Sequence, residues 1–177
     1  MNLTEATPFL FLTIVLIIAA LFDLRFQKIP NWLTFSTMVG AIVYHSSIKG
    51  TEGLLFSLAG VSLGIAIPIV PYLMGGMGAG DAKLLGAVGG VLGWKGVCLA
   101  FLFIGVVGGI YALVLLALHG WLKETGKRYG TMLKTFFLTR QFIYLPAPKK
   151  EKTPRLCYGL AIALGTLISV YSGIGIR

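Results

Sequence analysis

The chain has 177 residues, of which 56% are hydrophobic and only 12% are charged, and its mean hydropathy is +0.88. This composition excludes an ordinary soluble domain, because several apolar runs approach the roughly 20 residues that cross a bilayer as a helix. The runs are apolar throughout and lack the alternation of a β-barrel, so the predicted class is an all-α polytopic membrane protein. Membrane topology is the first explanation of the net charge of +9, because the basic residues lie mainly between the apolar runs.

Taken in chain order, the apolar runs predict six membrane-spanning helices joined by polar turns. No basic residues precede the first run and no small-residue cleavage site follows Ala20, so we expect a retained helix rather than a signal peptide. Pro30 suits the first turn of the second helix, and Pro68 and Pro71 should kink the third. The expected spans are approximately 7–23, 31–46, 54–74, 82–92, 96–118 and 156–174.

The fourth expected span, 82–92, is short and rich in glycine. Gly86 with Gly90, and Gly89 with Gly93, give overlapping pairs of small residues at a spacing of four, which permits close approach of a neighbouring helix. A helix this short either thins the bilayer locally or lies inside the bundle. We expect burial, because glycine faces offer lipid little to pack against.

The connection 120–155 holds nine of the fifteen Lys and Arg residues. Its apolar and basic residues alternate at helical spacing, which predicts an amphipathic helix on an anionic membrane surface, with a docking site for a protein partner as the alternative.

Twelve of the fifteen basic residues follow the first, third and fifth expected helices. By the positive-inside rule both termini face outward, and the turns that hold Asp23 and Asp81 face the cytoplasm.

Asp23 and Asp81 are the only aspartates in the chain, and each lies at the end of an expected span. An acidic group at a membrane boundary is costly and indicates function. Taken singly, Asp81 could be the N-cap of the fourth helix, and Asp23 could form a surface ion pair with Arg25 or Lys28. Taken together at one face, they favour a shared site, because two carboxyl groups that share a proton are the machinery of aspartic proteases.

The segments around the two aspartates resemble the two motifs of the type IV prepilin peptidases, membrane aspartic proteases marked by Gly-x-Gly-Asp. The first segment has the pattern D-x5-I-P-N from Asp23 to Asn31, and the second is Gly78-Ala79-Gly80-Asp81-Ala82-Lys83. The motifs occur in the family's order within a chain of six expected spans. The resemblance therefore covers essentially the whole chain.

This resemblance implies an endopeptidase that cuts a short basic leader from type IV prepilins or pseudopilins, at the cytoplasmic face of a prokaryotic inner membrane, in pilus biogenesis or protein secretion. It implies Asp23 and Asp81 as the catalytic pair, with Gly78 and Gly80 shaping the loop around Asp81. The other motif positions, whose roles the spacing does not define, are Arg25, Lys28, Pro30, Asn31 and Lys83. The expected partners are the prepilin and the lipid bilayer, with no cofactor, metal or nucleic acid.

Larger members of the family carry a cytoplasmic segment with two Cys-x-x-Cys pairs and also N-methylate the new pilin terminus. This sequence has only Cys98 and Cys157, which lie far apart and suit small apolar core positions. The resemblance is thus to the compact, peptidase-only form associated with tight-adherence pili and archaeal preflagellin systems. Neither methyltransferase activity nor a zinc site is expected.

Helix dipoles suggest a division of roles within the pair. Asp81 begins a helix and Asp23 ends one, so we expect Asp81 to be the ionised base and Asp23 the proton carrier. Two other functions stay open: a proton-coupled transporter that uses both aspartates as a relay, and a membrane scaffold held together by glycine faces. A relay needs acidic residues at staggered depths, whereas four of the expected spans have none in their interiors.

Overall fold

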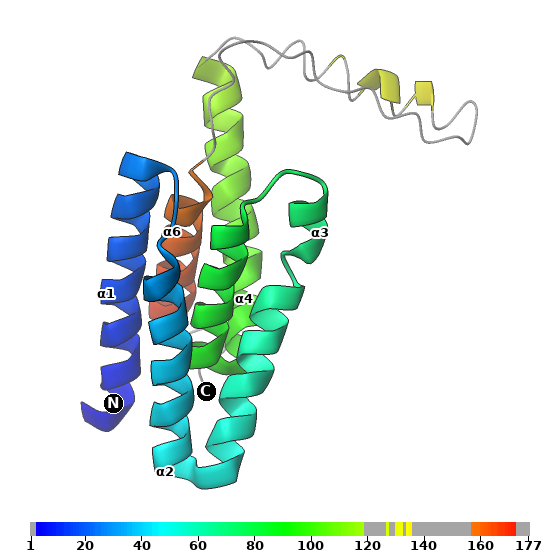
Figure 1. Cartoon of the computed structure of the whole chain (residues 1–177). Helices are drawn as coiled ribbons and strands as arrows, with labels where there is room; N and C mark the ends of the chain where they lie inside the picture. Colours follow the sequence, from blue (N-terminus) through cyan, green and yellow to red (C-terminus); the bar gives the residue numbers. More distant parts are fainter. Residues whose placement is uncertain (1–2, 119–126, 128–129, 133, 136–156, 173–177) are drawn as a thin grey trace. The chain divides into compact units, whose positions relative to one another are not determined.

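The computed structural model describes residues 3–118, 127, 130–132, 134–135 and 157–172, and this part of the chain is helical without strands. The all-α prediction is therefore confirmed. By its contacts the chain divides into two units, residues 1–108 with 157–177 and residues 109–156. The helices are α1 (Leu3–Phe26), α2 (Asn31–Ala66), α3 (Ile69–Leu73), α4 (Ala79–Leu118) and α6 (Tyr158–Tyr171), labelled in Figure 1.

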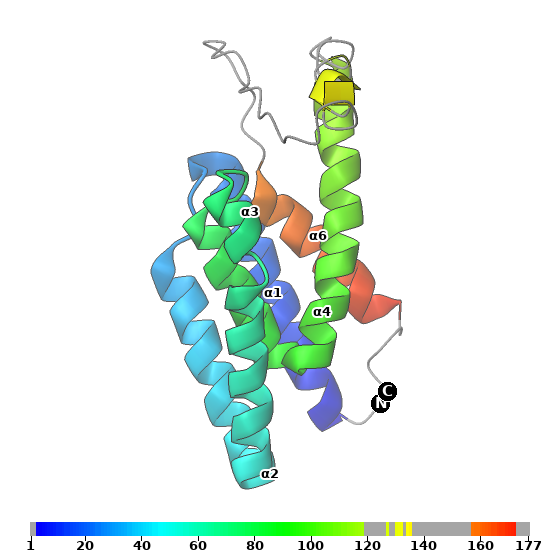
Figure 2. The same ribbon diagram turned by 90° about the vertical axis from the view of Figure 1, so that its right-hand side faces the viewer.

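The helices α2 and α4 are each interrupted at one glycine. Gly50 in α2 has φ 57° and ψ −132°, and Gly93 in α4 has φ 73° and ψ 179°. Glycine reaches such positive φ values without the steric cost that a Cβ atom would add. Each helix turns back on itself at this residue, as the two views in Figures 1 and 2 show. We expected polar residues 47–53 to form one turn and residues 93–95 to separate two spans. In the structure a single glycine makes each reversal.

Among the described residues, three stretches are long and apolar enough to cross a membrane, namely Thr7–Phe26, Asn31–Leu73 and Ala79–Leu118. The second and third contain 43 and 40 residues, about twice what one crossing needs, and each holds one of the glycine reversals. Tyr158–Tyr171 is a shorter apolar helix. This arrangement suits a multi-pass membrane protein. The number of six spans and the outward position of both termini stay predictions.

Two helix boundaries were predicted wrongly. The helix α4 begins at Ala79 rather than at Ala82, so Asp81 lies inside its first turn. Pro30 directly precedes α2 with φ −67° and ψ 134°, an extended conformation, rather than lying in the first helical turn. The expected kink at Pro68 is confirmed, because α2 ends at Ala66 and only the short α3 follows.

The second arm of α2 packs against the first arm of α4 through glycines. A methyl group on Gly60 would overlap the carbonyl group of Gly89, and one on Gly89 would overlap the carbonyl group of Gly60. The hydroxyl of Ser57 donates a hydrogen bond of 2.9 Å to the carbonyl oxygen of Gly90 across the same contact. Residues 84–91 are all buried, so the burial expected for the glycine-rich segment is confirmed.

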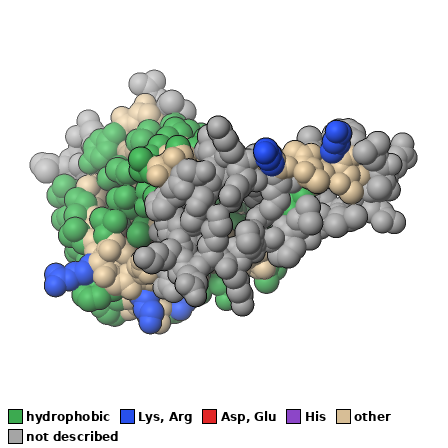
Figure 3. Space-filling model, turned by 90° about the horizontal axis from the view of Figure 1, so that it is seen from above, with side chains coloured by type: hydrophobic (Ala, Val, Ile, Leu, Met, Phe, Trp, Pro, Cys, Tyr) green, Lys and Arg blue, Asp and Glu red, His purple; other side chains and the backbone are tan. Residues whose placement is uncertain are grey.

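The core of the first unit joins α1, α2, α4 and α6, and α1 packs along α6. Outside this core, large apolar side chains on α1 are exposed, among them Leu10 at 63% and Leu21 at 60%. Figure 3 shows apolar side chains over much of the described surface, which suits contact with lipid. The largest fully buried aliphatic side chains are Leu12, Leu16, Leu84, Leu85, Val88, Val97 and Ile162.

The second unit contains the end of α4 and a few described residues of the predicted amphipathic helix. Residues 127, 130–132, 134 and 135 are helical, and the Thr131 hydroxyl donates a hydrogen bond of 2.8 Å to the carbonyl oxygen of Lys127. Helix is therefore confirmed at these positions. The rest of the basic connection 120–155 lies outside the described residues, and its binding to lipid or protein stays a prediction.

Candidate active site

Asp23 lies in the last turn of α1 and is buried, with only 7% of its surface exposed. Its Oδ2 accepts a hydrogen bond of 2.8 Å from the backbone N–H of Gly159, and the backbone of Leu160 also donates to the carboxyl group. Both donors belong to the first turn of α6, whose N–H groups have no partner within their own helix. The surface ion pair that the sequence allowed for Asp23 is wrong, because the carboxyl group caps α6 instead.

Asp81 is the third residue of α4 and is equally buried, at 8% exposure. Its Oδ2 accepts a hydrogen bond of 3.0 Å from the backbone N–H of Gly78, the residue directly before the helix. This is half of a capping box, in which a side chain at the third position reaches back to the N-cap amide. Asp81 thus caps the helix from inside its first turn, rather than from the N-cap position that the sequence suggested.

The two carboxyl groups converge at one end of the first unit. The C-terminal end of α1 and the N-terminal ends of α2, α4 and α6 lie together there in Figures 1 and 2. Asp23 and Asp81 are the buried acidic side chains among the described residues, and they interact electrostatically with each other. We call these two residues the aspartate pair. Described residues form no cluster of three or more His, Cys, Asp or Glu that could hold a metal ion.

The segments that carry the aspartate pair also contact each other directly. The Nζ of Lys83 donates a hydrogen bond of 2.9 Å to Oδ1 of Asn31 and lies 5.4 Å from the ring centroid of Phe35. A Cβ atom on Gly80 would lie 3.4 Å from Cβ of Ile29, which is buried. The turn between α1 and α2 is therefore packed against the first turn of α4.

Replacing Lys83 with methionine is expected to lower the free energy of unfolding by about 0.5–1 kcal/mol, because the hydrogen bond to Asn31 is lost while the apolar stem remains. The loss in a Lys83→Met, Asn31→Ala double variant should be smaller than the sum of the single losses. Lys95→Met is the matched control, since Lys95 stacks on the neighbouring Trp94. Thermal unfolding in detergent is measured for the wild type, both single variants, the double variant and the control. If the losses of unfolding free energy in the two single variants add up to the loss in the double variant, Lys83 and Asn31 do not stabilise the fold through their hydrogen bond.

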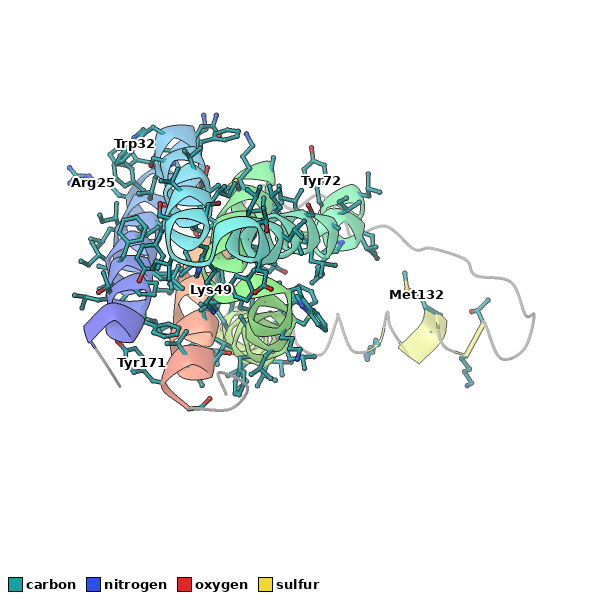
Figure 4. All side chains as sticks on the ribbon, turned by 90° about the horizontal axis from the view of Figure 1, so that it is seen from below. Arg25, Trp32, Lys49, Tyr72, Met132 and Tyr171 are labelled. Atoms are coloured by element: carbon teal, nitrogen blue, oxygen red, sulfur yellow. The ribbon has the colours of Figure 1, made fainter. Side chains whose placement is uncertain are left out.

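The motif residues Arg25 and Lys28 lie at the surface rather than in the site. The guanidinium group of Arg25 lies 5.6 Å from the ring centroid of Phe26, and Lys28 is exposed. Figure 4 shows the side chains of Arg25 and Trp32 pointing away from the bundle. Seen from above, the described surface in Figure 3 carries Lys and Arg but no visible carboxylate. Neither Arg25 nor Lys28 forms an ion pair with Asp23 in the described part of the chain.

Sequence reasoning missed Gly159, whose backbone holds Asp23 from 136 positions away. Nothing in the sequence marks it, because a backbone amide donor has no side-chain signature. The contact between Gly159 and Asp23 also removes the reason for assigning different roles to Asp23 and Asp81 from the helix dipoles. Asp23 does end α1, but it also lies at the N-terminus of α6, where the dipole favours a negative charge. Both members of the pair thus accept hydrogen bonds from the start of a helix.

The sequence profile of the type IV leader peptidase family matches residues 10–113, which include both aspartates. A curated relative, the prepilin leader peptidase/N-methyltransferase of Bacillus subtilis (strain 168), is 34% identical over 110 residues. The match covers 60% of this chain and 44% of the relative, so the chain spans less than half the length of that protein. No solved structure matches the chain. Since the family profile covers more than half of the sequence, the chain belongs to the type IV leader peptidase family.

Proposed function

We propose that this protein is a membrane aspartic endopeptidase, and that Asp23 and Asp81 are its catalytic residues. One observation carries the proposal: two buried carboxyl groups, from α1 and α4, converge at one end of a helix bundle and interact with each other. Burying two acidic groups near each other is unfavourable unless they have partners or share a proton. Backbone amides supply partners for both. A pair of this kind can hold one proton and one negative charge, as peptide hydrolysis requires.

In the proposed reaction one carboxylate takes a proton from a water molecule, whose oxygen then attacks the scissile carbonyl carbon. The other carboxyl group is protonated and donates a hydrogen bond to the carbonyl oxygen. When the tetrahedral intermediate collapses, the C–N bond breaks and the amine leaves with a proton from the pair. The products are a carboxylate on the leader and a free amine on the mature chain. Gly78 leaves room beside Asp81 for the substrate backbone, whereas the missing side chain of Gly80 lets the first turn of α4 pack against Ile29.

The proposed substrate is a type IV prepilin or pseudopilin, a class that the relative's name indicates. We propose cleavage at the cytoplasmic face of an inner membrane, since twelve of the fifteen basic residues lie in connections assigned to that side with the aspartate pair. We further propose peptidase activity alone, because the sequence contains no Cys-x-x-Cys pair. Transfer of a methyl group from S-adenosylmethionine to the new pilin terminus would contradict that last proposal.

The test reconstitutes the chain in liposomes with a candidate prepilin and follows leader removal by mass spectrometry of the mature N-terminus. A single new terminus, dependent on the added chain, is the expected result. Proton flux across the same liposomes is measured in parallel with a pH-sensitive dye, because the transporter alternative predicts flux without cleavage. Flux that requires both aspartates, in liposomes where several prepilins stay intact, would overturn the peptidase proposal.

A further inference from the structure

We infer that Gly159 is a positioning residue that holds the carboxyl group of Asp23 for catalysis, which makes the start of α6 part of the active site. The inference rests on the proposed function of Asp23. It extends the site to a helix outside the region that the family profile matches, residues 10–113.

The contact between Gly159 and Asp23 has two components. The first is the hydrogen bond of 2.8 Å from the Gly159 amide to Oδ2, beside the donation from Leu160. The second is steric: a Cβ atom on Gly159 would lie 2.9 Å from both Cβ and Oδ2 of Asp23 and 3.0 Å from Cγ. Any residue larger than glycine must therefore push either α6 or the carboxyl group out of place.

The position of α6 is fixed by packing farther along the helix. Ile162 is fully buried in the core, and a Cβ atom on Gly165 would lie 2.6 Å from the backbone of Ile104. With the helix held against α1 and α4, the amides of Gly159 and Leu160 meet Asp23 in a fixed position. Reaction between water, substrate and two carboxyl groups depends on such orientation, and a misplacement of about 1 Å can cost about 10²-fold in rate.

Asp81, the other member of the aspartate pair, is held by a similar contact. Gly78 donates its amide to Oδ2 of Asp81, and a Cβ atom on Gly78 would lie 3.1 Å from that oxygen. Each catalytic carboxyl group thus meets a glycine amide at the start of a helix. For Asp81 that glycine is local and belongs to the recognised motif. For Asp23 it comes from α6, and only the fold brings it there.

Gly159→Ala is expected to lower kcat for leader removal at least 10-fold, with KM within about 2-fold of wild type, because substrate binding does not involve α6 in this account. Gly53→Ala is the control: it introduces a buried overlap with the carbonyl group of His45, beside the reversal of α2 at Gly50, and its nearest neighbours are His45 and Lys49 rather than α6 or Asp23. It should lower the unfolding temperature while kcat per folded molecule stays within about 2-fold. A Gly159→Ala variant with wild-type kcat, or one that loses activity only in proportion to its folded fraction, would overturn the inference.

A spectroscopic test of the contact needs no activity. Labelling with ¹³C-carbonyl tyrosine and ¹⁵N-glycine selects the amides of glycines that follow tyrosine, and the sequence has two, Gly130 and Gly159. Asp23→Ala should shift the Gly159 signal, because that amide loses its acceptor, and should leave Gly130 nearly unchanged. Glu52→Gln should move neither.

The two measurements separate this inference from the proposed function. If Asp23→Ala abolishes cleavage but the Gly159 amide does not shift, the inference is overturned and the peptidase proposal stands. If the amide shifts and the wild-type chain cleaves no prepilin, the peptidase proposal is overturned, while the assignment of Gly159 as the residue that holds Asp23 is supported.

Discussion

Replacing either Asp23 or Asp81 with asparagine is expected to lower kcat for leader removal by about 10²- to 10⁴-fold. Asparagine keeps the size of the side chain and can still accept the hydrogen bond from Gly159 or Gly78. It cannot take a proton from water or deliver one to the leaving amine. The loss should therefore appear in kcat, with little change in the unfolding temperature. Cleavage is followed by the mobility shift of the prepilin on a gel, in detergent at fixed enzyme and substrate concentrations.

The matched control for these substitutions is Glu52→Gln. Glu52 is an acidic residue of α2, but it is exposed and lies beside the reversal at Gly50. Its replacement removes one negative charge from the chain without touching the aspartate pair, so the cleavage rate should stay within about 2-fold of wild type. An equal loss of activity in all three variants would mean that net charge, and not the pair, controls the reaction.

The second large effect is a loss of stability, which we expect from Gly89→Ala. The added methyl group would overlap the carbonyl group of Gly60, and a backbone group cannot move aside as a side chain can. Overpacking of a buried site usually costs about 1–3 kcal/mol, and a backbone clash should reach the upper end of that range or exceed it. Thermal unfolding in detergent, followed by circular dichroism, measures the change.

Gly105→Ala provides the comparison for Gly89→Ala. Both glycines lie in α4, but a Cβ atom on Gly105 would meet no other atom within 4 Å. Alanine also has the higher helix propensity, by about 0.8–1 kcal/mol. Gly105→Ala should therefore be neutral or slightly stabilising. If the two variants unfold at the same temperature, close packing between α2 and α4 does not stabilise the bundle.

Much of the fold could be predicted from the sequence, because lipid allows few solutions. Apolar runs of sufficient length become helices, and one of them is interrupted at Pro68, where a kink was expected. The glycine pairs of 82–92 correctly indicated a buried helix. The reversals were harder to locate. Predicted turns of several residues turned out to be single glycines, Gly50 and Gly93, because one residue with positive φ is enough to redirect a helix.

The aspartate pair was found from the sequence because acidic residues are so rare in it. Charge counting assigned Asp23 and Asp81 to one membrane face. In the structure the last turn of α1 and the first turn of α4, which carry them, lie at one end of the first unit. Local signals misplaced the start of α4, since Asp81 is as acceptable inside the first turn as before it. The partner of Asp23 could not be predicted. It is a backbone amide 136 positions away, and only tertiary packing brings α6 to that carboxyl group.

The proposed reaction requires the two carboxyl groups to act as one unit. The most direct measurement compares leader removal by the wild-type chain, Asp23→Asn, Asp81→Asn and the double variant in the same detergent preparation. Groups that act together lose their whole contribution when either is removed, so all three variants should fall to the same residual rate. A single variant that retains near-wild-type cleavage, or a double variant whose loss is the product of the two single losses, would contradict the account.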